Sequence, residues 1–403
     1  MNTFPPAASP RRFDLDWIRI IAFGLLIFYH IGMYYVTWDW HIKSPHASEL
    51  IEPLMQLTSP WRLALLFLVS GAATSFMMEK ITAGKLARSR SWRLLVPLIF
   101  GMIVIVPPQS YYEVVEKLQY REGYGSFWLR YIAADHGFAI DGKRLVLPTW
   151  NHLWFVVYLW AYTMLLAIVL AIAPRGMGRL TAWLERMLLA GGGWGVIVWP
   201  LLALAAFRIF LSGLFPSTHN LVHDWYNHSN YLMVFLFGFM FIRAGVISDV
   251  IMRRRWLCLG LAIASHTFIA FYENYYSDVL PPPDAIRYFQ RAVRASEQWC
   301  AILAILGFGR IWLNHDGPAR RYLTEAIFPF YIIHQTAIVV YAHNLQAFEL
   351  PIGIEVMVLI VATTATCFVS FEIIRRISWL RPAFGLNLKS NTSIGGSLQI
   401  QMP

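Results

Sequence analysis

The stretch DLDWIRIIAFGLLIFYHIGMYY, residues 14–35, is long and apolar enough to cross a membrane as one helix. It carries Arg19 and His30, two groups that are costly to place in lipid. Eleven residues at ~100° each return the two side chains to within about 20° of one helix face, roughly 16 Å apart. Both are therefore functional candidates. The structural alternative is a helix-end anchor at Arg19 and a packed histidine at position 30.

The composition predicts that most of the chain lies in lipid. Hydrophobic residues make up 57% of the 403 residues and charged residues 14%, whereas soluble domains are about a quarter charged. Ten apolar stretches are long enough to span a bilayer: 16–38, 58–79, 93–110, 151–173, 194–215, 230–248, 256–273, 297–314, 324–344 and 352–374. We expect an all-α polytopic membrane protein with ten transmembrane helices. Residues 1–384 would form a single membrane-embedded domain, and the polar segment 385–403 a flexible tail.

The basic residues predict the orientation, because Lys and Arg accumulate in cytoplasmic loops. With a cytoplasmic N-terminus, 22 of the 33 basic residues fall on the inner side, and all inner loops and both tails are basic. Both termini are thus expected in the cytoplasm, with residues 1–12 beginning an uncleaved signal anchor. The net charge of +10 is explained by this topology. Nucleic acid is therefore not an expected partner, whereas membrane lipid is.

Cysteine and histidine spacing predicts neither a disulfide framework nor a metal site. The three cysteines lie in apolar segments, and the loop histidines at 219, 223 and 228 lack a firm metal pattern. The longest connection is the expected outer loop 111–150, which is either a lid or substrate-contacting surface, or a plain exposed loop.

Arginines at the inner side suggest a phosphate-bearing ligand. Arg90 and Arg93, with Arg88 beside them, start the third expected span, and the i, i+3 spacing forms a fork suited to phosphate oxygens. A plain topology signal is the alternative. A donor held there could extend a thin arm to His30 near the middle of the membrane, and coenzyme A has that shape.

These residues resemble the signatures of the membrane-bound acyltransferase family 3. Arg19 and His30 match its R-x10-H motif, and Arg90 and Arg93 its R-x-x-R motif. The resemblance extends to LFLVSGAATSF (66–76), NHLWFVVYL (151–159), FPFYIIHQ (328–335) and ISWLRPAFGL (377–386). It implies an O-acyltransferase in a bacterial inner membrane. The donor would be cytoplasmic acyl-CoA as co-substrate, with no tightly bound cofactor, and the acceptor a hydroxyl of a periplasmic glycan. The segment YHIGMYYVTWDWHIKS (29–44) resembles a glucan-modifying member, which implies a glucan acceptor and a succinyl group.

Acyl transfer from a thioester to a hydroxyl needs a base, and neutral imidazole suits that role. We expect His30 to be this base, or to carry the acyl group itself as an acyl-imidazole. Asp16 can pair with Arg19 or serve as a helix N-terminal carboxylate. His334 is expected at a depth similar to that of His30. It would orient His30, donate to an oxyanion, contact the acceptor or simply pack between helices.

Other residues are candidates for acceptor or acyl binding. His152, Asn151 and Trp154 begin the fourth expected span at its outer surface, where polar and aromatic groups suit a sugar. His41 is a weaker candidate on the same side. Arg208 lies in the outer half of its span, where it would hold a carboxylate on the acyl group, stabilise an oxyanion or snorkel outward.

A function of another class is also consistent with the sequence. A transporter or flippase for a lipid-linked or acylated glycan could use His30 and Arg208 along its pathway, with the inner arginines acting only as topology signals. Acyl-CoA-dependent release of free CoA distinguishes the two functions.

Overall fold

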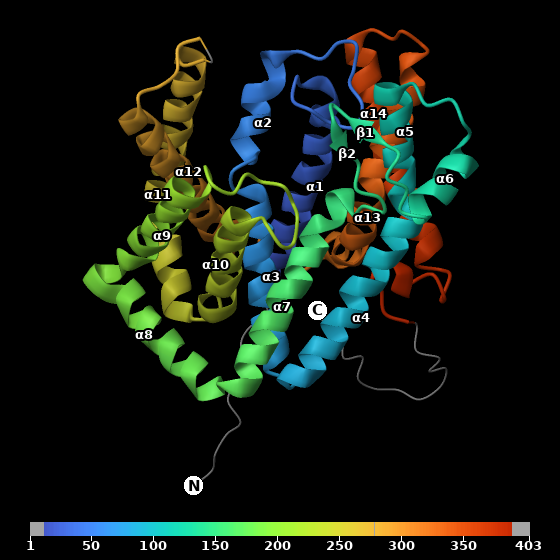
Figure 1. Cartoon of the computed structure of the whole chain (residues 1–403). Coiled ribbons are helices and arrows are strands. Elements are labelled where there is room, and N and C mark those ends of the chain that lie inside the picture. Colours follow the sequence, from blue (N-terminus) through green and yellow to red (C-terminus); the bar gives the residue numbers. More distant parts are fainter. Residues whose placement is uncertain (1–11, 278, 389–403) are drawn as a thin grey trace, which may run out of the picture.

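The computed structural model describes residues 12–277 and 279–388, which form a bundle of long helices (Figure 1). The helices are α1 (Phe13–Tyr35), α2 (Glu52–Thr58), α3 (Arg62–Met78), α4 (Ala83–Phe100), α5 (Pro107–Leu118), α6 (Tyr124–Ile132), α7 (Trp154–Ile172), α8 (Pro174–Gly193), α9 (Gly195–Leu211), α10 (Trp225–Phe241), α11 (Gly245–Tyr275), α12 (Asp284–Trp312), α13 (Pro318–Gln346) and α14 (Ile352–Ile374). The short elements are 3-10 turns at Glu49–Ile51, Asn151–Leu153 and Pro382–Phe384, a π-helical turn at Gly101–Ile105, and the strands β1 (Ala139–Ile140) and β2 (Lys143–Arg144), which pair antiparallel.

The all-α class is confirmed, and each of the ten apolar stretches overlaps a helix. Within the described part of the chain, seven helical segments are long and apolar enough to cross a membrane, and α8 with α9 adds an eighth if that bent pair is one span. The pair bends by 116° at Gly191, Gly192 and Gly193, whose positive φ angles glycine adopts without strain. The count of ten and the cytoplasmic termini stay predictions. Most of the expected tail, from residue 389, lies outside the described residues.

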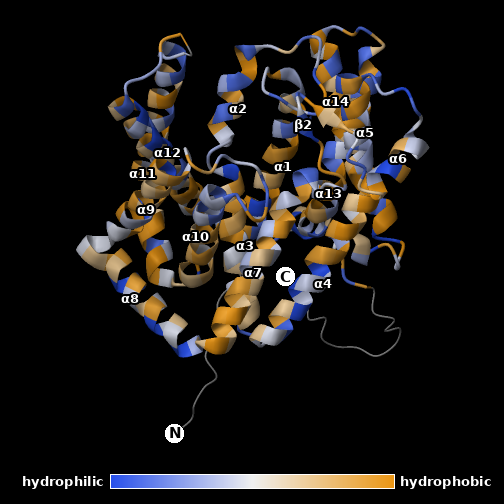
Figure 2. Cartoon of the chain, viewed as in Figure 1, coloured by the Kyte–Doolittle hydropathy of each residue, from blue (hydrophilic) through white to orange (hydrophobic). Residues whose placement is uncertain are grey.

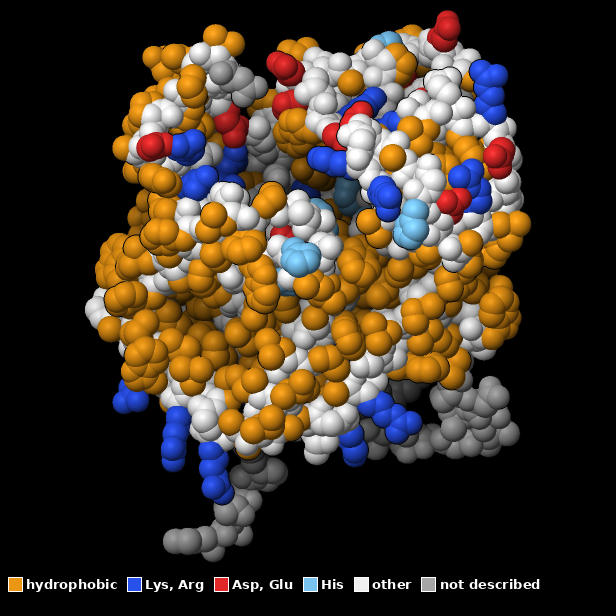
Figure 3. All heavy atoms as spheres, in the orientation of Figure 1, with side chains coloured by type: hydrophobic (Ala, Val, Ile, Leu, Met, Phe, Trp, Pro, Cys, Tyr) orange, Lys and Arg blue, Asp and Glu red, His pale blue; other side chains and the backbone are white. Residues whose placement is uncertain are grey.

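An apolar belt crosses the face of the bundle that Figure 3 shows. Hydrophobic residues cover the middle of the helices (Figure 2), and the space-filling view shows them between a fringe of Lys and Arg at one end and mixed charges at the other (Figure 3). The first of these ends, where α1 begins, is called the basic end below, and the other the opposite end. This distribution is that of a protein whose sides face lipid.

Helix α1 lies inside the bundle and contacts α3, α12 and α13. Helices α3 and α10 approach each other most closely at two glycines. A Cβ on Gly71 would meet the backbone oxygen of Phe235, and one on Gly238 would meet that of Leu68. Small residues at such contacts let two membrane helices pack backbone to backbone.

We expect Gly238→Ala to destabilise the protein by about 1 to 3 kcal/mol, because the added methyl group can be accommodated only by moving two backbones apart. The measurement is thermal unfolding of the purified protein in detergent. Gly260→Ala in α11 is the matched control, since its Cβ meets no atom within 4 Å. An unchanged melting temperature for Gly238→Ala would contradict the close packing of α3 on α10.

The segment expected as an outer loop from 111 to 150 contains the end of α5, all of α6 and the two strands, joined by irregular segments. Pro107 and Pro108 lack backbone N–H groups, so carbonyls of the preceding π-helical turn are free to accept other bonds. Trp128 Nε1 donates to Ile103 O at 3.0 Å, and Thr336 Oγ1 donates to Ile105 O at 2.6 Å. These bonds attach the turn to α6 and α13, and α5 begins directly after it. The sequence patterning missed α5 because its helix is only half apolar.

Candidate functional site

His30 of α1 and His334 of α13 form a hydrogen-bonded pair, although 304 residues separate them in the chain. His30 Nδ1 lies 2.8 Å from His334 Nε2, and the two rings stack with centroids 5.0 Å apart. His334 is fully buried, whereas His30 is partly exposed. The expectation that both histidines lie at a comparable depth agrees with this contact.

Hydrogen bonding fixes the tautomers of this pair. His334 Nδ1 lies 2.8 Å from the carbonyl oxygen of Tyr331 and 3.2 Å from that of Phe330, and a carbonyl can only accept. The proton of neutral His334 is therefore on Nδ1, and its Nε2 accepts from His30 Nδ1–H. The remaining nitrogen of His30, Nε2, keeps a free lone pair. His334 thus orients His30 as a proton acceptor or nucleophile.

His30 lines a cavity of about 600 Å³. The cavity floor is formed by Leu26, Phe155 and Tyr331, and loop residues at the opposite end surround its mouth: Asp39, Trp40, His41, Ser59, Thr149, Trp150, Ser217, Thr218 and His219. Figure 3 shows this face of the molecule hollowed in its upper half, with histidine side chains in and beside the hollow. The cavity gives His30 access from the end away from the basic residues.

Amides and two further histidines form a polar wall beside the pair. His152 Nε2 donates to Ile332 O at 3.1 Å, and its Nδ1 accepts from Gln109 Nε2 at 3.3 Å. Gln109 Oε1 accepts from Asn151 at 3.1 Å and from Gln335 at 3.0 Å. Because both ring nitrogens of His152 are already bonded, this histidine holds the wall in place.

His41 belongs to the same wall, nearer the mouth. Its Nδ1 lies 2.6 Å from Glu113 Oε2, and its Nε2 lies 3.1 Å from Gln335 Nε2. Gln335 can only donate through that amide nitrogen, so His41 Nε2 accepts and His41 Nδ1–H donates to the carboxylate. The structure thus brings His41, predicted as an acceptor-side residue, into the cavity with His30.

Charged groups at the mouth have perturbed proton affinities. Burial acts to raise the pKa of Asp39, but the hydrogen bond and charge of Lys117 outweigh it and lower that pKa. Burial lowers the pKa of His219 against the opposing charge of Asp224, so this imidazole is neutral at pH 7. The mouth therefore combines the carboxylate of Asp39 with polar and aromatic groups.

Trp154 is less available to a sugar than its position in the sequence suggests. Its ring stacks on that of His219 at 4.2 Å and is 7% exposed. Trp40 and Trp150 line the same cavity and are partly exposed. A sugar ring that enters the cavity would meet these two indoles more readily than Trp154.

At the basic end, Arg19, Arg90 and Arg93 form a group of like charges that act on one another. The Nε atoms of Arg19 and Arg90 are buried and have no hydrogen-bond partner among the described residues. Arg90 donates to Thr74 Oγ1 at 3.1 Å. Three part-buried guanidiniums with so few partners among the described residues favour an anion between them.

Asp16 is shared between two arginines. It lies 3.9 Å from Arg19 and 2.5 Å from Arg320, which is also paired with Asp316. The closer contact is thus with Arg320, which leaves Arg19 only weakly compensated. The pairing of Asp16 with Arg19 that the sequence suggested is present, but it is the longer of the two.

The structure does not bring every predicted residue to these two regions. Arg208 Nη1 donates to Tyr226 at 2.7 Å, and Arg208 is absent from the residues that line the His30 cavity. Arg88 is exposed at the basic end. His228 Nδ1 lies 3.0 Å from the Tyr162 hydroxyl oxygen, and His228 Nε2 lies 2.9 Å from Leu221 O. His228 does not share these partners with His219.

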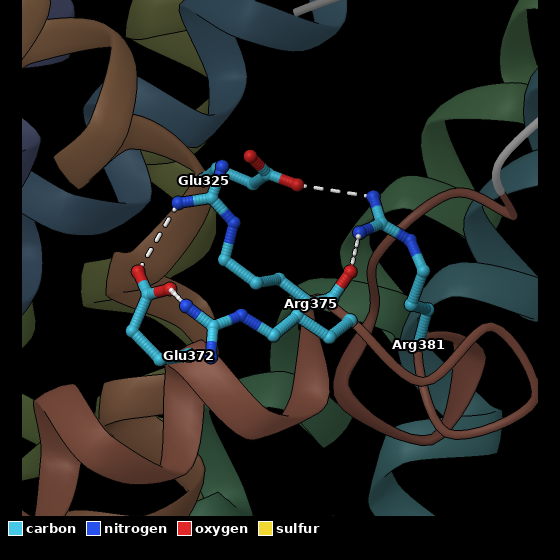
Figure 4. A pocket seen from close by; sticks show the side chains of 5 residues that line it. Glu325, Glu372, Arg375 and Arg381 are labelled. Carbon is cyan, nitrogen blue, oxygen red and sulfur yellow. Dashed lines mark hydrogen bonds and ion pairs between the residues drawn. The ribbon is translucent and has the colours of Figure 1, made fainter.

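A second pocket lies near the C-terminal end of α14, and Figure 4 shows its lining residues. Its arginines are already paired with carboxylates: Arg375 and Arg376 with Glu372, and Arg381 with Glu325. Because two carboxylates offset most of the charge of the three arginines, this pocket is a poorer anion site than the group around Arg19.

Comparison with known proteins identifies the family. A family model described as an acyltransferase domain matches residues 12–375. The chain belongs to the membrane-bound acyltransferase family 3. Among curated proteins, glucans biosynthesis protein C of Escherichia coli O6:K15:H31 is 25% identical over 160 residues, and that of Escherichia coli K12 is 25% identical over 163 residues. Each match covers 40% of this chain and 39% of the relative. No solved structure matches the chain.

The family signatures now have positions in the fold. The R-x10-H motif places Arg19 in the basic group and His30 in the cavity on one continuous helix, and FPFYIIHQ supplies both His334 and Gln335. Sequence reasoning missed Gln109 and Arg62, which also belong to the cavity or its wall. The signal for Arg62 is a single arginine within the apolar stretch 58–79.

Proposed function

We propose that this acyltransferase moves an acyl group from acyl-CoA, bound at the basic end, to a hydroxyl of a periplasmic glycan that enters the cavity at the opposite end. The observation that carries the proposal is the His30–His334 pair. It leaves a free lone pair on His30 Nε2, and His30 lines that cavity. A glucan acceptor and a succinyl group are the most specific form of the proposal. They rest on the partial match to glucans biosynthesis protein C.

The reaction uses His30 Nε2 twice. The acceptor hydroxyl gives its proton to this nitrogen while its oxygen attacks the thioester carbonyl carbon, and the carbonyl electron pair moves to oxygen. The tetrahedral intermediate then re-forms the carbonyl as the C–S bond breaks, and His30 returns the proton to the CoA thiolate. In the alternative route the same nitrogen attacks the thioester carbonyl carbon, and the C–S bond breaks to release the CoA thiolate. The acceptor hydroxyl then takes the acyl group from the acyl-imidazolium, which frees the imidazole, and the hydroxyl proton passes to the thiolate.

Arg19, Arg90 and Arg93 would hold the phosphates of CoA, because guanidiniums bind phosphate oxygens through charge-assisted hydrogen bonds. On α1, Arg19 and His30 lie about 16 Å apart along the helix axis, a gap for the pantetheine arm. Phe23 packs on Tyr331 and Phe155, with ring centroids at 5.3 and 6.2 Å, and so occupies this helix face. Donor binding therefore requires these rings to move.

The test of this function is chemical. Purified protein with labelled acyl-CoA should release free CoA in proportion to the glycan that becomes acylated, and only when the acceptor is present if His30 acts as a base. A transporter or flippase would move a glycan without releasing CoA. Absence of acceptor acylation with every acyl-CoA tested would sink the proposal.

We expect Arg90→Gln and Arg93→Gln each to raise KM for acyl-CoA by about 10-fold or more while changing kcat little, since a phosphate contact far from the thioester stabilises ground state and transition state equally. Initial rates against acyl-CoA concentration measure this. Arg179→Gln, an exposed arginine of α8, is the matched control. A fall in kcat at unchanged KM would contradict the assignment of the phosphate site.

A further inference from the structure

Arg62 is a charged residue of the cavity that takes no part in the steps proposed above. It is the first residue of α3, it is 2% exposed, and it lines the same cavity as His30. A charged group buried to this degree is costly unless it is paired. The groups that neutralise the charge of Arg62, or fail to, therefore indicate which ligand the cavity can bind.

The guanidinium of Arg62 has neutral neighbours. Its Nη1 donates to Thr58 Oγ1 at 2.9 Å, and its Cζ lies 3.8 Å from the ring centroid of Tyr29. Its Nε is buried without a hydrogen-bond partner, and no carboxylate of the described residues forms an ion pair with it. A hydroxyl and a cation–π contact fix the group in place but leave its charge unneutralised.

Tyr29 connects this guanidinium to the histidine pair. The Tyr29 and His30 rings have centroids 6.1 Å apart. Arg62 Cζ can therefore lie no further from the His30 ring than that distance and the 3.8 Å to Tyr29 taken together. Both residues line the same cavity, so a thioester carbonyl attacked beside His30 Nε2 could turn its oxygen toward Arg62. Donors about 2.7 to 3.1 Å from such an oxygen stabilise an oxyanion.

We propose that Arg62 is the oxyanion-binding residue of the acyl transfer, which rests on the proposed function. Negative charge develops on the carbonyl oxygen when the acceptor oxygen adds, and it is lost when the C–S bond breaks. A preorganised cation that is unpaired in the resting protein gains its partner only in that interval, so it lowers the barrier without holding the substrate more tightly.

The experiment compares full-length wild-type protein with Arg62→Gln and Arg62→Lys, using acetyl-CoA, butyryl-CoA and succinyl-CoA with one glucan acceptor. We expect Arg62→Gln to lower kcat by about 10²- to 10³-fold with every donor the wild type accepts, and to change both KM values by less than about threefold. Arg62→Lys keeps the charge without the planar fork, so part of the rate should return. Arg144→Gln, on exposed β2, is the matched control.

The outcomes separate the possible roles. A loss confined to succinyl-CoA would mean that Arg62 binds a carboxylate on the acyl group, and a rise in KM alone would mean ground-state binding; either overturns the proposal, as does an unchanged rate. If Arg62→Gln does not fold, as judged by gel filtration and melting temperature, Arg62→Lys replaces it. A lowered kcat with unchanged KM values then supports the proposal, and a wild-type kcat overturns it. Wild-type protein that acylates no acceptor would refute the proposed function, whereas an active wild type with unaffected variants refutes only the role of Arg62.

Discussion

His30→Gln is expected to lower the rate of acyl transfer by about 10³-fold or more, because it removes the ring nitrogen Nε2 that the contact with His334 keeps available to accept a proton or an acyl group. Glutamine keeps much of the side-chain volume and its polarity, so the loss reports on proton transfer or acyl attachment rather than on packing. KM for acyl-CoA should change little, since the nucleotide would be held at the basic end.

The measurement is acceptor-dependent release of CoA by purified variants with equal melting temperatures. His46→Gln, an exposed histidine between α1 and α2, is the control and should keep wild-type kcat. Exchange of labelled CoA into acyl-CoA without acceptor separates the two routes: an acyl-imidazole supports exchange, whereas a base does not. Full activity of His30→Gln by both readouts would remove this residue from the chemistry.

His334→Ala is expected to lower kcat by about 10²-fold, although His334 is not among the residues that line the cavity. Without its Nε2, the Nδ1–H of His30 loses its acceptor, and the other tautomer, with the proton on Nε2, becomes populated. His334→Gln should be less impaired, because a side-chain amide oxygen can accept the same hydrogen bond.

Steady-state kinetics and a pH–rate profile of both variants test this positioning role. A change in the tautomer and proton affinity of His30 shifts the pH dependence of kcat, whereas a merely structural defect would lower the amount of active enzyme at every pH. Equal loss in the alanine and glutamine variants, with an unshifted profile, would argue that His334 only fills space.

Local sequence patterns predicted the helices well. The length and hydrophobicity of a segment depend on that segment alone, so each expected span overlaps a helix of the structure. The patterns failed at residues 107–118, where α5 begins after two prolines and carries only one buried face. An amphipathic helix at the end of a membrane segment has neither the length nor the continuous hydrophobicity of a span.

Site residues were predictable where the position of a residue along its helix was enough to indicate which other residues lie at the same depth. His30 and His334 were expected at similar depth, and the structure pairs them. Which carboxylate lies nearest to which arginine depends on helix rotation and packing, so the closer pairing of Asp16 with Arg320 was not foreseen. The same limit applies to Arg208, which lies at a suitable depth but contacts Tyr226.

A cryo-EM structure with a non-hydrolysable thioether analogue of acyl-CoA and a glucan fragment would locate donor and acceptor together. We expect the acyl carbonyl between His30 Nε2 and Arg62, the sugar in the cavity at the opposite end, and the phosphates among Arg19, Arg90 and Arg93. Phosphates held at the pocket of Arg375 and Arg381, or a carbonyl beyond reach of His30, would contradict this expectation.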